Sequence, residues 1–207
     1  MKNRNTLFGI LLLWTATTFA QDEGGMQTLF KGGKTIGGMG GVFTQVAAFN
    51  GEPGFYLGGG GGALINGKLM IGGYGMGLIS SHSVNITSQT PEGAVTESFN
   101  VDMGQGGLWL NYSHRPERLV HLNYGLMLGA GGLSYYRTND PSRSFYSSGY
   151  FAVTPSLGVE VNLFEFMKLR ASGAYQLSTA FERGPLQNTD INSPMFRIGL
   201  FVGYFGN

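Results

Sequence analysis

The residues best suited to covalent chemistry are a histidine and the serines around it. His82 stands in a run of hydroxyl side chains formed by Ser80, Ser81 and Ser83. A histidine activates a serine hydroxyl by accepting its proton, and a third group, commonly a carboxylate, has to orient the imidazole. Glu92 and Glu97 follow in the same polar stretch. A solvated loop histidine is the simpler interpretation of His82, and a catalytic Ser–His pair is the alternative.

Two other patterns that could carry chemistry are weak. Gly62, four further residues, Gly67 and Lys68 begin like a phosphate-binding loop, but Leu69 stands where a Ser or Thr would bind magnesium. The three histidines of the chain are scattered, whereas the ligands of a metal must converge. We therefore expect no enzyme activity, no metal and no cofactor.

The elements that hold these residues are predicted to be β-strands, because apolar and polar residues alternate along the chain with a period of two. From Phe151 to Leu163 the odd positions are apolar apart from Pro155, and the even positions carry small or polar side chains. Successive side chains of a β-strand point to opposite faces, so such a segment has one apolar and one polar face. The same pattern recurs at 167–180 and 195–205.

The whole chain divides into eight candidate strands joined by alternating short and long connections. The strands are expected at 35–48, 54–65, 68–81, 98–113, 118–136, 149–163, 167–180 and 195–205. Tight turns follow the second, fourth and sixth strands, and the first of these, Asn66-Gly67, is a strong hairpin signal. Long polar loops are expected near 82–98, 137–149 and 181–194.

Composition narrows the class of protein. Gly occupies 36 of 207 positions, charged residues make up 12%, and the net charge is +1. A chain with 42% hydrophobic residues and so little net charge is not disordered, and it lacks the basic excess typical of nucleic-acid binding. Without cysteine there is no disulfide framework and no zinc–cysteine site.

The first twenty residues have the pattern of a secretory signal peptide. Lys2 and Arg4 precede an apolar run from Leu7 to Trp14, and small residues stand before a cleavage site after Ala20. The apolar run is shorter than the ~20 residues that a membrane-spanning helix requires. We expect a leader at 1–20, a short periplasmic segment at 21–34 and a β domain at 35–207.

Eight antiparallel strands in an exported chain predict a small transmembrane β-barrel, which pairs every backbone group without a free edge. Aromatic residues near the strand ends are expected to form two belts at the membrane interfaces. The alternative is a soluble lipocalin-like carrier, in which the apolar face points inward. The polar face has very few charges, whereas a water-exposed face normally has many. We therefore expect the apolar face to meet lipid.

On this assignment a set of polar residues lines the lumen: Glu160, Asn162, Lys168, Arg170, Gln176, Arg197, Asp102, His121 and Asn123. The tight turn near Glu165 places Glu160 opposite Arg170, and opposite charges attract across a strand pair. Asp102 is expected to meet Arg197 across the barrel. An eight-stranded barrel has just enough interior for side chains, so we expect a structural polar core, with an ion-conducting lumen as the alternative.

The chain resembles the eight-stranded outer-membrane barrels of diderm bacteria, the OmpA/OmpX-like group in the broad sense. The most specific match is an assembly signal in the last strand, formed by Arg197, Gly199, Val202 and Tyr204. Phe205 and two further residues follow it, where many members of the group stop at an aromatic residue.

The resemblance implies an integral outer-membrane protein whose partners are outer-membrane lipid, lipopolysaccharide and the barrel assembly machinery. Some small barrels of this kind modify lipid A with a His and a Ser at the outer rim, but the deacylase pattern has one residue between the two, and His82-Ser83 has none. We expect a non-enzymatic role, either through the surface loops or as an accessory subunit of a larger outer-membrane complex, and no nucleic-acid partner.

Overall fold

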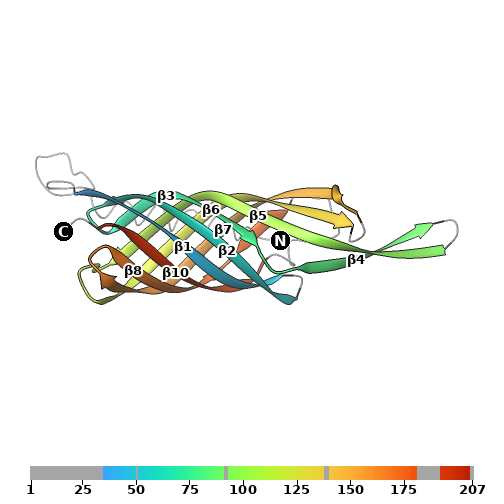
Figure 1. The fold of residues 1–207 in the computed structure, drawn as a ribbon. Coiled ribbons are helices and arrows are strands. Elements are labelled where there is room, and N and C mark those ends of the chain that lie inside the picture. Colours follow the sequence, from blue (N-terminus) through green and yellow to red (C-terminus); the bar gives the residue numbers. More distant parts are fainter. Residues whose placement is uncertain (1–34, 50, 91–92, 138–139, 181–191, 206–207) are drawn as a thin grey trace, which may run out of the picture. The chain divides into compact units, whose positions relative to one another are not determined.

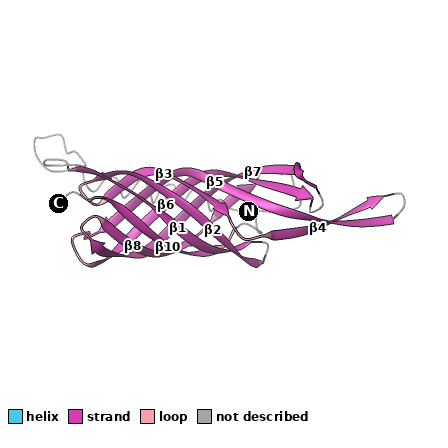
Figure 2. Ribbon diagram, in the orientation of Figure 1, coloured by secondary structure: helices cyan, strands magenta, loops and turns pink. Residues whose placement is uncertain are grey.

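The computed structural model describes residues 35–205 except 50, 91–92, 138–139 and 181–191, so the expected leader and the segment 21–34 lie outside it. The described chain is built of β-strands (Figures 1 and 2). They are β1 (Ile36–Phe49), β2 (Glu52–Ile65), β3 (Leu69–Leu78), β4 (His82–Thr90), β5 (Gly93–His114), β6 (Val120–Arg137), β7 (Asp140–Phe164), β8 (Met167–Tyr175), β9 (Leu177–Ala180) and β10 (Pro194–Tyr204). Within these residues no helix is long and apolar enough to cross a bilayer.

Eight of the strands form a closed antiparallel ring. Around the ring the order is β1, β2, β3, β5, β6, β7, β8, β10, and β10 pairs with β1 to close it. β4 continues β3 after a short break and pairs with β5, while β9 continues β8 and pairs with β7. The expected eight-stranded antiparallel barrel is therefore confirmed.

The tight turns follow from local conformational preferences. Asn66 and Gly67 adopt φ of 53° and 65°, as the type I′ turn between β2 and β3 requires. Arg115, in the turn between β5 and β6, also has a positive φ of 54°. The three short turns expected after the second, fourth and sixth strands all join neighbouring strands of the ring.

Two of the expected long loops are instead extensions of strands. Residues 82–90 pair with 93–101 as a hairpin, and β7 begins at Asp140, so only residues 138–139 separate it from the end of β6 at Arg137. The prediction of loops at 82–98 and 137–149 was wrong because these hydroxyl-rich and amide-rich stretches lack apolar alternation, although Thr, Val, Ile and Tyr favour strands. Most of the third loop, 181–194, lies outside the described residues.

The apolar faces point outward around the ring. Val42, Leu108 and Leu157 are 62%, 60% and 56% exposed, on three different strands. Their neighbours in sequence, such as Phe43 and Trp109, are 1% exposed and point inward. An outward apolar band is the arrangement of a lipid-facing barrel, and it excludes the soluble carrier, whose apolar face would be inside.

Side chains fill the interior in layers. One apolar cluster includes Phe49, Tyr135 and Tyr150 at the end where β4 continues from β3, and a second includes Phe43, Trp109 and Phe201 toward the short turns. The aromatic belts are therefore smaller than expected: Phe55, Phe151, Tyr112, Phe164, Phe166 and Tyr204 are exposed, but Phe49, Tyr56, Tyr135, Tyr150 and Trp109 are core residues.

Candidate functional site: the interior, rims and wall of the barrel

The centre of the polar interior is Glu160, on β7, which is fully buried. Its Oε1 accepts hydrogen bonds from Nε (2.8 Å) and Nη2 of Arg170, the residue opposite it on β8. Its Oε2 accepts hydrogen bonds from Ser113 Oγ (2.7 Å) and His121 Nε2 (2.8 Å). Both carboxylate oxygens are thus occupied, and the register expected for Glu160 and Arg170 is the observed one.

The guanidinium of Arg170 also lies against aromatic rings. Its Cζ is 4.4 Å from the centroid of Phe201 and 5.4 Å from that of Trp109. Trp109 in turn meets Phe201 and Phe43 edge to face, with centroids 5.6 and 5.8 Å apart. Cation–π contacts of this kind are stronger when desolvated. Arg170 therefore joins the polar cluster to the apolar core beside it.

His121 and Asn123 enter the same cluster from β6. His121 Nδ1 donates to the Arg118 carbonyl (3.0 Å), which fixes the ring so that Nε2 faces Glu160. Asn123 Nδ2 donates to Ser113 Oγ (3.3 Å). Ser113 was not identified from the sequence as an interior residue, although it follows buried Trp109 and Asn111 at every second position of β5.

Arg197, on β10, has a different partner from the one expected. Its Nε and Nη2 donate to Gln45 Oε1 at 3.0 and 2.7 Å, and its Cζ lies 4.9 Å from the Phe43 ring. Asp102 is exposed and points outward, because Val101 and Met103 occupy the inward positions beside it. The prediction that Asp102 meets Arg197 was wrong. Knowing which alternate residues of one strand point inward does not tell which residues do so in another strand when the connection between them is irregular.

The remaining interior residues lie at different levels of the barrel. Lys168 Nζ lies 4.3 Å from the centroid of Phe205 near the short turns. Gln176, 2% exposed, lies at the break between β8 and β9, where its N–H donates to the Ser193 carbonyl (3.0 Å). A second polar group was not foreseen: Gln105 Nε2 donates to Tyr74 Oη, and Tyr150 Oη donates to Gln105 Oε1 (3.1 Å).

His82 is a buried strand residue rather than a solvated loop histidine. It is 8% exposed, its Nδ1 lies 3.3 Å from Ser80 Oγ, and its ring meets Phe49 edge to face at 5.2 Å. Ser80 Oγ also accepts a hydrogen bond from the Phe55 N–H (3.0 Å). Glu97 is the register partner of Ile86, which lies four residues after His82 on β4. At the rise of a strand, His82 and Ile86 are about 13 Å apart along the hairpin. Glu92 lies outside the described residues.

The residues of the expected assembly signal alternate along β10. Val202 and Tyr204 are 46% and 59% exposed on the outer wall, while Arg197 and Gly199 point inward. A Cβ on Gly199 would come within 2.9 Å of Phe43 Cβ, the residue opposite it on β1. The glycine of the pattern is thus required by packing at the β1–β10 seam.

Part of the outer wall is built of glycine. We call these outward residues of β1, β2, β3, β5 and β6 the glycine wall: Gly38, Gly40, Gly59, Gly61, Gly73, Gly75, Gly77, Gly104, Gly106 and Gly132. They are contiguous, since Gly77 pairs with Gly104 and Gly104 with Gly132. A Cβ on Gly75 would meet no atom within 4 Å, and on Gly104 none closer than 3.9 Å. Packing within the chain therefore does not require glycine at these two positions.

No protein-family model matches the chain, and no curated protein matches it. Among solved structures it is similar to neisserial surface protein A (NspA), with 14% identity over 83% of this chain and 99% of that one and a TM-score of 0.57. It is also similar to the outer-membrane protein OprG from Pseudomonas aeruginosa (11% identity, 82% and 96% covered, TM-score 0.49). Ail, the attachment invasion locus protein of Yersinia pestis, is a third (14%, 83% and 99%, TM-score 0.44).

At these identities the likeness is one of fold, and it agrees with the closed eight-stranded ring and its outward apolar band. The chain therefore has the fold of the small eight-stranded outer-membrane β-barrels.

Proposed function

We propose that the protein is a non-enzymatic outer-membrane barrel that acts through its exterior, by binding a partner at the surface hairpin formed by β4 and residues 93–101 of β5. The observation that supports this most directly is the filled interior. Arg170, Glu160 and Trp109 are each 3% exposed or less and are held by one another and by neighbouring strands. Such an interior leaves the rims and the wall for interaction.

The surface hairpin is well suited to recognition. β5 pairs with β3 only over Gly104–Tyr112, whereas its residues 93–101 pair with β4, so the hairpin runs on past the ring (Figure 1). In the described pairings the other edge of β4 has no neighbouring strand. An open strand edge offers backbone groups to an added strand. Ser83, Asn85 and Asn100 are exposed on the hairpin and add hydrogen-bonding side chains.

Enzyme chemistry at the same rim has less support. The His82 imidazole is engaged by Ser80 and Phe49, which is the environment of a side chain that fixes the base of the hairpin. For the described residues, no third group orients it as a catalytic pair requires.

The test is site-specific photo-cross-linking in cells of the source organism. A cross-linker at Asn85 reports on the hairpin, and one at exposed Leu157 reports on the lipid-facing wall. The proposal expects a discrete adduct from Asn85 and none from Leu157. A cross-linker at exposed Ser83, just outside the hairpin tip, is expected to lose its adduct when residues 84–98 are replaced by a two-residue turn and the barrel still refolds. Absence of any hairpin-dependent adduct would count against a surface-binding role.

A second candidate is an accessory subunit of a larger outer-membrane complex, with the apolar wall of another barrel as its partner. The glycine wall supports it, because glycine in a strand costs roughly 0.5–1 kcal/mol relative to alanine, and the open space around Gly75 and Gly104 gives no steric reason for it. Without side chains the backbone can approach a neighbouring barrel closely.

A matched pair of positions tests this candidate. Gly75 lies on β3, and Gly173 lies on β8, directly across the ring, with no atom within 4 Å of a Cβ at either. A cross-linker at Gly75 is expected to yield an adduct with a second barrel, and one at Gly173 is not. Equal labelling from both positions, or lipid adducts alone, would contradict an accessory role for this wall.

A further inference from the structure

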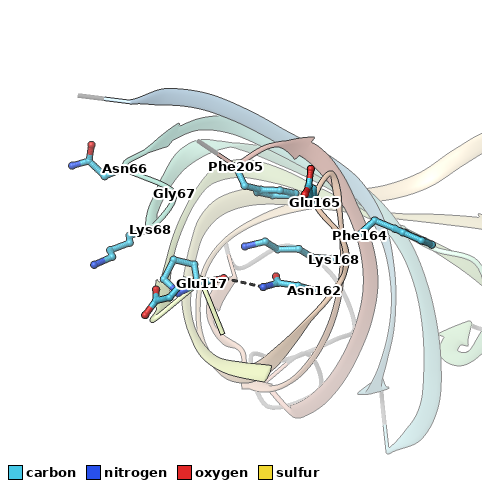
Figure 3. Close-up of a pocket in the computed structure, with 10 residues that line it drawn as sticks. Asn66, Gly67, Lys68, Glu117, Asn162, Phe164, Glu165, Lys168 and Phe205 are labelled. Carbon is cyan, nitrogen blue, oxygen red and sulfur yellow. Dashed lines mark hydrogen bonds between the residues drawn. The ribbon is translucent and has the colours of Figure 1, made fainter. Parts of the chain in front are cut away.

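At the short-turn end of the barrel lies a cavity of about 400 Å³ that none of the interactions above occupies. It is framed by the turns after β2, β5 and β7 and by Phe205, which follows β10. Figure 3 shows Lys168 and Asn162 side by side in this mouth, with the head groups of Lys68 and Glu117 turned away from them. Small-molecule sites commonly have volumes of about 300–1,000 Å³.

The feature that indicates a ligand is the ammonium group of Lys168. The residue is 4% exposed, and its Nζ lies over the Phe205 ring at 4.3 Å. Among the described residues no ion pair joins it to a carboxylate. Glu160 attracts it through space, but the oxygens of Glu160 are hydrogen-bonded to Arg170, His121 and Ser113. A buried charge is stable only when it is paired. The cavity leaves room for an anion beside this one.

Asn162 adds an oriented acceptor. It is the register partner of Lys168, and its Nδ2 donates to the Pro116 and Arg118 carbonyls, both at 2.9 Å. These two bonds fix the amide, and its Oδ1 has no hydrogen-bond partner among the described residues. The mouth thus brings together a cation, an aromatic face and a buried amide oxygen that lacks a hydrogen-bond partner.

We propose that this cavity binds a small carboxylate that carries an adjacent N–H group, as the C-terminal end of a peptide does. The carboxylate pairs with Lys168 Nζ, the N–H donates to Asn162 Oδ1, and the side chain beside them packs on Phe205. Because short turns of outer-membrane barrels face the periplasm, the ligand is a periplasmic molecule. This site is independent of the surface hairpin and of the glycine wall.

Calorimetric titration of the refolded chain in detergent tests the proposal with N-acetylalanine as the probe. Three further compounds are titrated for comparison. N-acetylalanine amide lacks the negative charge, propionate lacks the N–H group, and inorganic phosphate has a different anionic group in place of the carboxylate. Binding of N-acetylalanine is expected to exceed that of each of the other three by about tenfold or more, the size of a lost charge-assisted hydrogen bond. Equal binding of the amide, or of phosphate, would overturn the proposal.

Three variants locate the site. Lys168→Met keeps the length of the side chain without the charge and is expected to abolish binding, while Lys168→Arg retains it. Arg115→Asn removes an exposed charge at the same end of the barrel, outside the lining of the cavity, and asparagine tolerates the positive φ of that position. It is the control and is expected to bind as the parent does. A difference in gel migration between heated and unheated samples establishes that each variant is folded. Undiminished binding by folded Lys168→Met would refute the assignment.

Discussion

Glu160 and Arg170 face each other across the turn that joins β7 and β8, and one carboxylate oxygen accepts hydrogen bonds from two nitrogens of the guanidinium. The pair is held away from water, and the rings of Trp109 and Phe201 lie on the guanidinium. Its energetic importance lies in the penalty for separating it, because a buried charge that loses its partner keeps the desolvation cost without the attraction.

Glu160→Ala is therefore expected to lower the free energy of unfolding by about 3–5 kcal/mol. The double variant Glu160→Leu/Arg170→Met, which removes both charges and keeps apolar volume, is expected to recover a large part of that loss. Urea unfolding in phospholipid vesicles, followed by Trp fluorescence, measures both. A double variant as unstable as the single one would show that the charges do not act as a pair.

Two glycines of β3, Gly72 and Gly75, are expected to respond in opposite ways to replacement by alanine. A Cβ on Gly72 would lie 2.0 Å from the Gly61 carbonyl oxygen, so Gly72→Ala should destabilise the barrel by about 1–3 kcal/mol through overpacking. At Gly75 there is open space, and Gly75→Ala should raise stability by roughly 0.5 kcal/mol. The same urea titration compares them, and a loss at Gly75 equal to that at Gly72 would contradict the argument.

His82→Ala is expected to loosen the base of the surface hairpin and leave lipid A unchanged. Loss of the Phe49 contact and of the bond to Ser80 should cost about 1–2 kcal/mol, which speeds hydrogen exchange of β4 amides by about tenfold. Ser83→Ala, at an exposed position of the same strand, is the control. A changed lipid A mass spectrum in the His82 variant would instead favour the enzyme.

Tyr204→Ala is expected to reduce the amount of barrel in the outer membrane several-fold while refolding into detergent stays normal. The side chain is 59% exposed on the outer wall, so its loss leaves little packing undone, and the defect would lie in recognition by the assembly machinery. Phe196→Ala, 56% exposed on the same strand and outside the signal pattern, is the control. Equal defects in cells and in detergent would indicate a packing role for Tyr204.

Planar bilayers that contain the protein are expected to show no discrete conductance steps. Trp109, Phe43 and Phe201 lie in the interior and are each 1% exposed. Arg170→Ala should also be silent, because these rings remain. Reproducible steps in the parent protein, with an increase in Arg170→Ala, would support an ion-conducting lumen.

The elements predicted best from sequence were those with regular alternation and short turns. A tight turn fixes the register on both sides, and for that reason Glu160 and Arg170 could be paired from their numbers alone. His121 and Asn123 were assigned to the interior for a similar reason, since β6 keeps its alternation from end to end.

Other parts of the interior could not be obtained in this way. Asp102 was placed on the wrong face because the polar stretch 82–98 was expected to be a loop. The inward positions of β3 could therefore not be counted forward into β5. Gln45 lies in a strand whose glycines interrupt the alternation, and its contact with Arg197 joins residues at opposite ends of the chain. Sequence spacing carries no information about such a pairing until the ring is known.

The seam between β1 and β10 also dictates the order in which the barrel can be completed. Gly38 pairs with Tyr204 and Ala47 with Met195, so the ring closes only between the first and last strands of the chain. Contacts this distant in sequence carry the largest loop-closure entropy and form slowly. Until β10 has been synthesised, the free edge of β1 exposes its backbone groups. Closure and burial of that edge are therefore a single final event, and any factor that escorts the chain must hold two strands with nearly the whole polypeptide between them.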